Sequence, residues 1–152
     1  MTAKVFQLLS GAVFLASAAT SAHSLPARAF ERAELFASCS GRLEALATHQ
    51  NGFGVGRYDL TRELVATFEL MLDATLPMAL EQGVPENQAE KWRSQGWVEM
   101  AALLAQANFS FDSQVAERMT EALNDRIAEC TSVVLSGGTD LSYVTQTQNP
   151  TR

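Results

Sequence analysis

The chain has 152 residues, a net charge of −6 and two cysteines. This length supports a single domain, with enough apolar surface for a core that needs neither metals nor several disulfides. The acidic balance, without any basic cluster, argues against nucleic acids and anionic membranes as partners.

The N-terminal residues have the pattern of a cleaved export signal. A positive start is followed by a mostly apolar run at 5–15 and by mostly small residues at 16–24. The apolar run is too short for a bilayer, which needs about 20 residues. We therefore predict a signal peptide over residues 1–22, with Ser24 as the alternative cleavage position, and no stable membrane span after cleavage.

Helical periodicity dominates the rest of the chain. Apolar residues recur at steps of three and four through 26–136, and no segment alternates over the length of a strand. Four amphipathic segments with short connections predict an all-α, four-helix bundle-like domain over 26–136. The polar residues 137–152 are predicted to form a flexible C-terminal tail.

The first predicted helix covers 26–50 and ends at the glycine-rich residues 51–56. Its expected inward face consists of Phe36, Cys39, Leu43 and Leu46. The second helix begins near Asp59, a good N-cap residue, and its expected inward face consists of Leu60, Leu64, Phe68 and Met71. Pro77 must either kink this helix or end it, and the sequence does not decide between the two.

The third predicted helix opens with Pro85 at its first position and Glu86 in its first turn. Its expected inward face consists of Ala89, Trp92, Gly96, Met100, Leu103 and Ala107. Residues 110–113 cap the fourth helix, and two glycines at 137–138 stop it. The inward face of that helix consists of Ala116, Met119, Leu123, Ile127, Cys130 and Val134.

The two cysteines lie on the apolar faces of the first and last helices. In an up-down-up-down bundle these helices are neighbours, so we predict a Cys39–Cys130 disulfide. A redox-active or metal-binding pair would need closely spaced cysteines, which the sequence lacks. A disulfide behind an export signal predicts a periplasmic or secreted protein, and the excess of arginine over lysine favours a bacterial periplasm.

Residues with catalytic or metal-binding potential are scarce. No nucleophile–base set can be argued when both cysteines are expected to be bonded, so we predict no catalytic residues and no cofactor. His23, as a new N-terminal residue after cleavage, could join His49 in a Cu(II) site. The two histidines lie at opposite ends of the first helix, roughly 35 Å apart, which favours two solvent-exposed histidines instead.

Three features indicate a surface that binds another protein. Trp97 falls near the boundary of the third helix's apolar face, where it either packs at the edge of the core or anchors a protein interface, at which tryptophan is enriched. Phe53 and Val55 are apolar residues in the glycine-rich connection. The fourth helix carries an acidic edge, which is either simply solvated or a docking strip for a basic partner or Ca²⁺: Glu117, Glu121, Asp125 and Glu129.

These features predict an exported, non-enzymatic helical accessory or protein-interaction module in the periplasm, with a protein partner that the sequence does not identify. The alternative is a helical bundle that binds a small ligand or metal in the space around Met71, Trp92 and Met100. An enzyme is the third and least favoured hypothesis.

Overall fold

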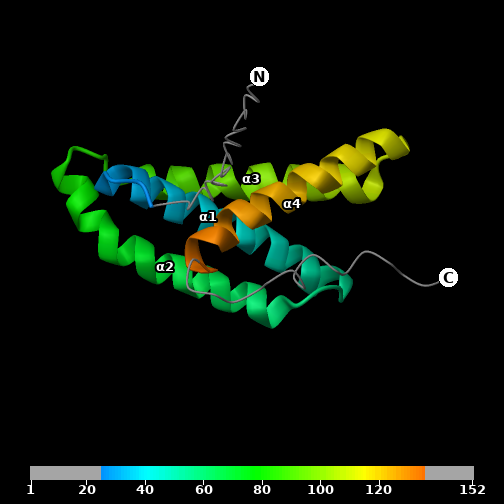
Figure 1. Ribbon diagram of the computed structural model, residues 1–152, viewed down its shortest axis with the longest axis horizontal. Helices are drawn as coiled ribbons and strands as arrows, with labels where there is room; N and C mark the ends of the chain where they lie inside the picture. The colour runs from blue at the N-terminus through cyan, green and yellow to red at the C-terminus, as the bar shows by residue number, and fades with distance from the viewer. Residues whose placement is uncertain (1–24, 136–152) are drawn as a thin grey trace, which may run out of the picture.

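The computed structural model describes residues 25–135, which form four α-helices and no strand (Figure 1). The helices are α1 (Ala29–Phe53), α2 (Tyr58–Glu81), α3 (Gln88–Phe109) and α4 (Ser113–Leu135). The all-helical prediction is confirmed. The predicted signal peptide and C-terminal tail lie outside the described residues.

Helix α1 is the centre of the structure. It packs along α2 and along α3, which lie on opposite sides of it, while α4 packs mainly on α3 and crosses α1 over a short stretch (Figure 1). The prediction that the first and last helices are neighbours therefore holds at a crossing and not along their lengths. The reason is that α2 and α3 already cover the two sides of α1.

The composition of α1 explains its central position. An amphipathic surface helix buries one apolar stripe, whereas α1 buries residues on more than one side. Many of these are small, so neighbouring backbones can approach closely: Ala29, Ala33, Ala37, Ser40, Gly41, Ala45 and Ala47. The predicted inward residues of α1, among them Phe36 and Leu43, are buried as well.

Two glycines bring α1 and α3 into direct backbone contact. A Cβ atom added to Gly41 would lie 2.8 Å from the carbonyl carbon of Arg93 and closer still to its oxygen. A Cβ atom added to Gly96 would lie 3.0 Å from the carbonyl carbon of Ser38, again with the oxygen nearer. Each helix thus presents a glycine to a carbonyl group of the other, and no other residue fits at either position without a shift of the backbone.

The predicted cysteine pair connects α4 to α1. The sulfur atoms of Cys39 and Cys130 are at bonding distance, their Cα atoms lie 5.5 Å apart, and both residues are fully buried. The bond spans 91 positions of the sequence. A disulfide that closes a long loop typically stabilises a protein by about 2–4 kcal/mol, which matters here because α4 has few other contacts with α1.

Several helix boundaries differ from the prediction. Helix α1 continues through Phe53, and the chain turns at Gly54, whose φ of 61° is favourable for glycine. Pro85 is not the first residue of α3: it lies in the preceding turn, where its carbonyl oxygen accepts a hydrogen bond from Gln88 at 2.9 Å. The prediction that residues 110–113 cap α4 is confirmed, since Asp112 Oδ1 accepts a hydrogen bond from the backbone N–H of Gln114 at 2.9 Å.

Helix α2 continues through Pro77 to Glu81. The proline is exposed, so water can hydrogen-bond to the carbonyl group that loses its helical partner. Because α2 packs mainly on α1, it buries a narrow face, and that face is turned by about one residue from the expected one. Its buried residues are Thr61, Val65, Phe68, Leu72 and Ala79.

We expect Gly41→Ala to lower the free energy of unfolding by about 1–3 kcal/mol, because the added methyl group overlaps a backbone carbonyl that cannot rotate away. Urea unfolding followed by circular dichroism measures this change.

Gly52→Ala is the matched control on the same helix. An added Cβ atom at Gly52 meets nothing within 4 Å, so this change should stabilise the protein by about 0.5–1 kcal/mol through helix propensity. Equal effects of the two substitutions would contradict the close α1–α3 contact.

Candidate functional site

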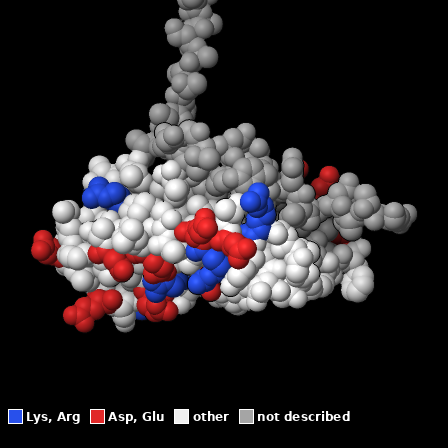
Figure 2. All heavy atoms as spheres, turned by 90° about the horizontal axis from the view of Figure 1, so that it is seen from below, with Lys and Arg blue, Asp and Glu red and all other residues white. Residues whose placement is uncertain are grey.

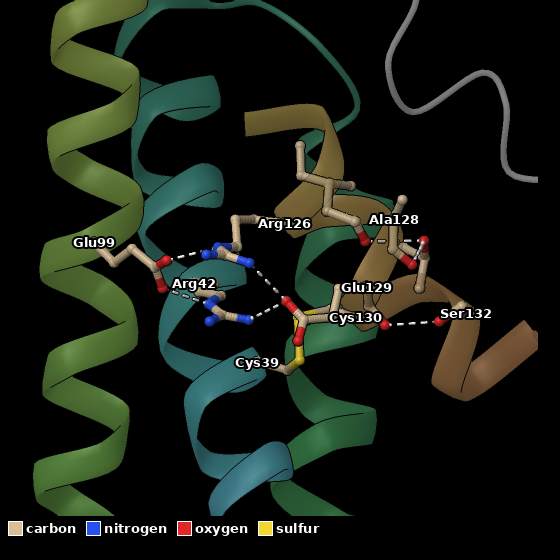
Figure 3. A network of polar contacts seen from close by, with 10 residues as sticks. Cys39, Arg42, Glu99, Arg126, Ala128, Glu129, Cys130 and Ser132 are labelled. Atoms are coloured by element: carbon tan, nitrogen blue, oxygen red, sulfur yellow. Dashed lines mark hydrogen bonds and ion pairs between the residues drawn. A yellow bond between two sulfur atoms is a disulfide. The ribbon is translucent and has the colours of Figure 1, made fainter. Parts of the chain in front are cut away.

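A closed ring of four charged side chains lies beside the disulfide (Figure 3). Arg42 on α1 donates to Glu99 on α3 at 2.8 Å and to Glu129 on α4 at 2.9 Å. Arg126 on α4 donates to the other oxygen of Glu99 at 2.7 Å and lies 3.4 Å from Glu129. The ring therefore connects three helices around Cys130.

The ring shifts the pKa values of Glu99 and Arg126. Burial alone would raise the pKa of Glu99, but hydrogen bonds from Arg126 and Arg42 outweigh it and hold this pKa below the usual value. The hydrogen bond to Glu99 raises the pKa of Arg126 in turn. The lowered pKa of Glu99 favours its charged form, as a structural ion pair requires.

A second polar network joins α1, α2 and α3. Arg93 makes two hydrogen bonds to the carboxylate of Glu69, at 3.1 and 2.5 Å, and one to Glu90 at 2.7 Å. Ser40, which is buried on α1, donates to the same Glu69 carboxylate. Burial would lower the pKa of Arg93, yet its two carboxylate partners raise it. This network connects α2, α1 and α3 through the carboxylate of Glu69.

The most exposed aromatic side chains lie where α1 and α3 end. We call Phe53, Phe109 and Phe111, together with His49, the aromatic end. The rings of Phe53 and Phe109 are 6.0 Å apart, and the ring of His49 lies 4.6 Å from that of Phe53. Phe53 and Phe109 are 59% and 62% exposed, and Phe111 is fully exposed. Three phenylalanine rings are therefore more than half exposed near the ends of α1 and α3.

The sequence identified Phe53 but missed Phe109 and Phe111. Phe109 lies opposite the inward face of α3, and Phe111 belongs to no helix, so helical periodicity could not find either one. Two phenylalanines only two positions apart at a helix end were the available indication. Val55, also predicted, is 41% exposed and follows Phe53 in the chain.

The other predicted interaction residues lie elsewhere. Trp97 is 41% exposed, but it precedes Phe109 by twelve positions on α3, which is about 18 Å along the helix. On α4 all four carboxylates of the acidic edge are exposed, but they differ in their partners: Glu129 belongs to the ion-pair ring. The other three form no ion pair within the described residues: Glu117, Glu121 and Asp125.

The face of the molecule drawn in Figure 2 is acidic without being uniform. On the face drawn in Figure 2, acidic side chains outnumber basic ones, and most basic side chains lie beside acidic ones.

The proposed metal pair remains a prediction, because His23 lies outside the described residues. Burial lowers the pKa of His49, which packs against Phe53. Between residues 25 and 135, no three histidine, cysteine, aspartate or glutamate side chains gather closely enough to hold a metal ion. Over the same stretch, no helix combines the length and apolar character needed to cross a membrane.

No protein-family model, curated protein or solved structure matches the chain. Any proposal about function therefore rests on the geometry of the chain itself.

We expect the ion-pair ring to make stability depend on acid pH. A carboxyl group whose pKa is depressed in the folded state stabilises the protein above its unfolded pKa and loses this effect as the pH falls through the folded pKa. The wild type should therefore lose stability from about pH 5 downwards, and Glu99→Gln should lose less over the same range. At pH 7 the variant should be less stable by about 0.5–1 kcal/mol, because solvent screens a partly exposed pair.

Urea unfolding at several pH values measures both effects. Glu117→Gln is the control, since Glu117 is exposed on the same helix as Arg126 and forms no ion pair within the described part of the chain. Identical pH profiles for Glu99→Gln and the wild type would show that the ring does not contribute to stability.

Proposed function

We propose that this chain is an exported, non-enzymatic helical module that binds a protein partner through its aromatic end. The observation that carries the proposal is the contact between Phe53 and Phe109, two rings that touch each other and yet are both more than half exposed.

Aromatic side chains supply much of the binding energy at protein interfaces because they combine large apolar area with few rotatable bonds. The aromatic end meets this description. Phe53 and Phe109 come from the ends of two helices that the α1–α3 contact holds together, so their backbones are fixed before binding. The partner expected here is a protein that presents an apolar surface or segment, since the rings offer little hydrogen bonding.

The arrangement of polar groups favours a binding protein over an enzyme. The half-buried carboxylates of Glu69 and Glu99 both accept hydrogen bonds from arginines, and both cysteines are bonded. Groups held in this way stabilise a fold and do not transfer protons or attack a substrate.

Export is supported by two independent features. The N-terminal residues have the pattern of a secretory signal. The buried cysteine pair is at bonding distance, which is typical of proteins that fold in an oxidising compartment. Together they support a periplasmic or secreted protein.

The alternative of a ligand-binding bundle receives less support. The expected lining residues Met100 and Trp92 are buried in the same cluster as the rest of the apolar core. Methionine in such a position commonly fills irregular space between helices, so this function is not proposed.

The tagged full-length chain, recovered from the envelope of its native host after brief cross-linking, tests the proposal. We expect Phe53→Ser combined with Phe111→Ser to reduce the recovered partner protein at least about tenfold, because the variant loses two aromatic anchors. Quantitative mass spectrometry of the captured proteins gives this ratio.

Leu70→Ser combined with Met78→Ser is the matched control, since both residues are exposed apolar side chains on α2. Both variants should unfold at the temperature of the wild type. The intact mass of the recovered chain should show a start at His23 or Leu25 and two hydrogens fewer than the reduced form. Equal losses in both variants, or a partner retained by the aromatic variant, would rule the proposed site out.

A further inference from the structure

The outer face of α3 carries a continuous apolar stripe. Val98, Ala102, Ala105 and Phe109 follow one another at steps of four, three and four positions, which places them in one line along a helix. All four are exposed, with Val98 at 61% and Phe109 at 62%. The buried residues of α3, such as Gly96 and Met100, lie on the opposite side of the helix. We call these four residues the α3 stripe.

The α3 stripe is uncharged within an acidic protein. From residue 94 to residue 109 the sequence holds one charged residue, Glu99, which lies away from the stripe and is paired with Arg42 and Arg126. The exposed faces of α2 and α4 carry carboxylates instead: Glu63, Asp73 and Glu81 on α2, and Glu117, Glu121 and Asp125 on α4. Two copies of a chain with a charge of −6 repel each other least where such a stripe faces its own copy.

The α3 stripe also matches itself when it is reversed. If two α3 helices lie antiparallel about a two-fold axis midway between Ala102 and Ala105, then Val98 faces the partner's Phe109 and Ala102 faces the partner's Ala105. Small residues then meet at the centre, where the helix axes approach most closely, and larger apolar residues meet on both sides. An interface of this kind uses the same patch on both subunits, as two-fold dimers require.

We propose that this chain forms an antiparallel homodimer through the α3 stripe. The spacing of four, three and four is that of the a and d positions along which helices pair in coiled coils. The stripe is about 16 Å long, so the contact is smaller than the roughly 800 Å² per partner of a standard interface. We therefore expect a weak dimer that forms only at high protein concentration.

Sedimentation equilibrium of the full mature chain, from about 5 µM to about 1 mM, tests the dimer. The wild type should pass from monomer to dimer over this range. Ala102→Glu should raise the dissociation constant at least about tenfold, because it puts like charges at the centre of an apolar contact. Ala66→Glu on α2 is the matched control, an exposed alanine given the same charge, and it should leave the constant unchanged.

Single cysteines test the orientation, because the native cysteine pair is fully buried. In a mixture of Val98→Cys and Phe109→Cys chains, a short bismaleimide should join unlike chains more than like ones. Three results would each overturn the proposal. They are a wild type that is monomeric at about 1 mM, equal effects of Ala102→Glu and Ala66→Glu, and cross-links that join mainly like chains. Ala102 does not belong to the aromatic end and precedes Phe109 by seven positions, about 10 Å along α3. Ala102→Glu should therefore still recover the partner protein, which separates this result from that of the partner-binding test.

Discussion

The contact of α1 with α3 at Gly41 and Gly96 is the constraint on which the rest of the structure depends. At this crossing each backbone lies against a carbonyl group of the other helix, and the reciprocal pair fixes both the separation and the register of the two helices. A close α1–α3 pair leaves room for α2 on the far side of α1. It also sets the ends of α1 and α3 next to each other, and this places Phe53 beside Phe109.

Helix α4 is attached to this layer by different means. Its first turns contain no fully buried residue, whereas Leu123, Ile127 and Cys130 enter the core from the middle of the helix onwards. The disulfide and the ring of Arg42, Glu99, Arg126 and Glu129 act at the same place, one covalently and one electrostatically. An oxidising compartment and a pH above the titration range of carboxylates are the conditions in which both attachments are intact.

The sequence predicted those features that periodicity alone determines. Cys39 and Cys130 fall on apolar faces whichever way the helices are arranged, so their pairing could be predicted before the arrangement was known. The central position of α1 could not be predicted from the sequence. Its second buried side consists of alanine, serine and glycine, and these residues do not stand out as core residues in a hydropathy pattern. Glu129 is interpreted from the sequence as part of an edge that is either solvated or a docking strip. Its ion pair with Arg42 could not be predicted, because the two residues are 87 positions apart in the sequence. Of the three phenylalanines of the aromatic end, only Phe53 was predicted, for a similar reason. The ends of α1 and α3 lie side by side in the structure but far apart in the sequence.

Hydrogen exchange of backbone amides tests the central claim most directly, because it measures the stability of each helix separately. If the α1–α3 contact holds the fold together, the amides of residues 38–47 and 93–100 should exchange slowest, through global unfolding alone. Those of residues 113–122 should exchange faster, and reduction of the disulfide should release the rest of α4 before α1. Protection that is strongest in α2 or in the first half of α4, with residues 38–47 exchanging earlier, would contradict the account.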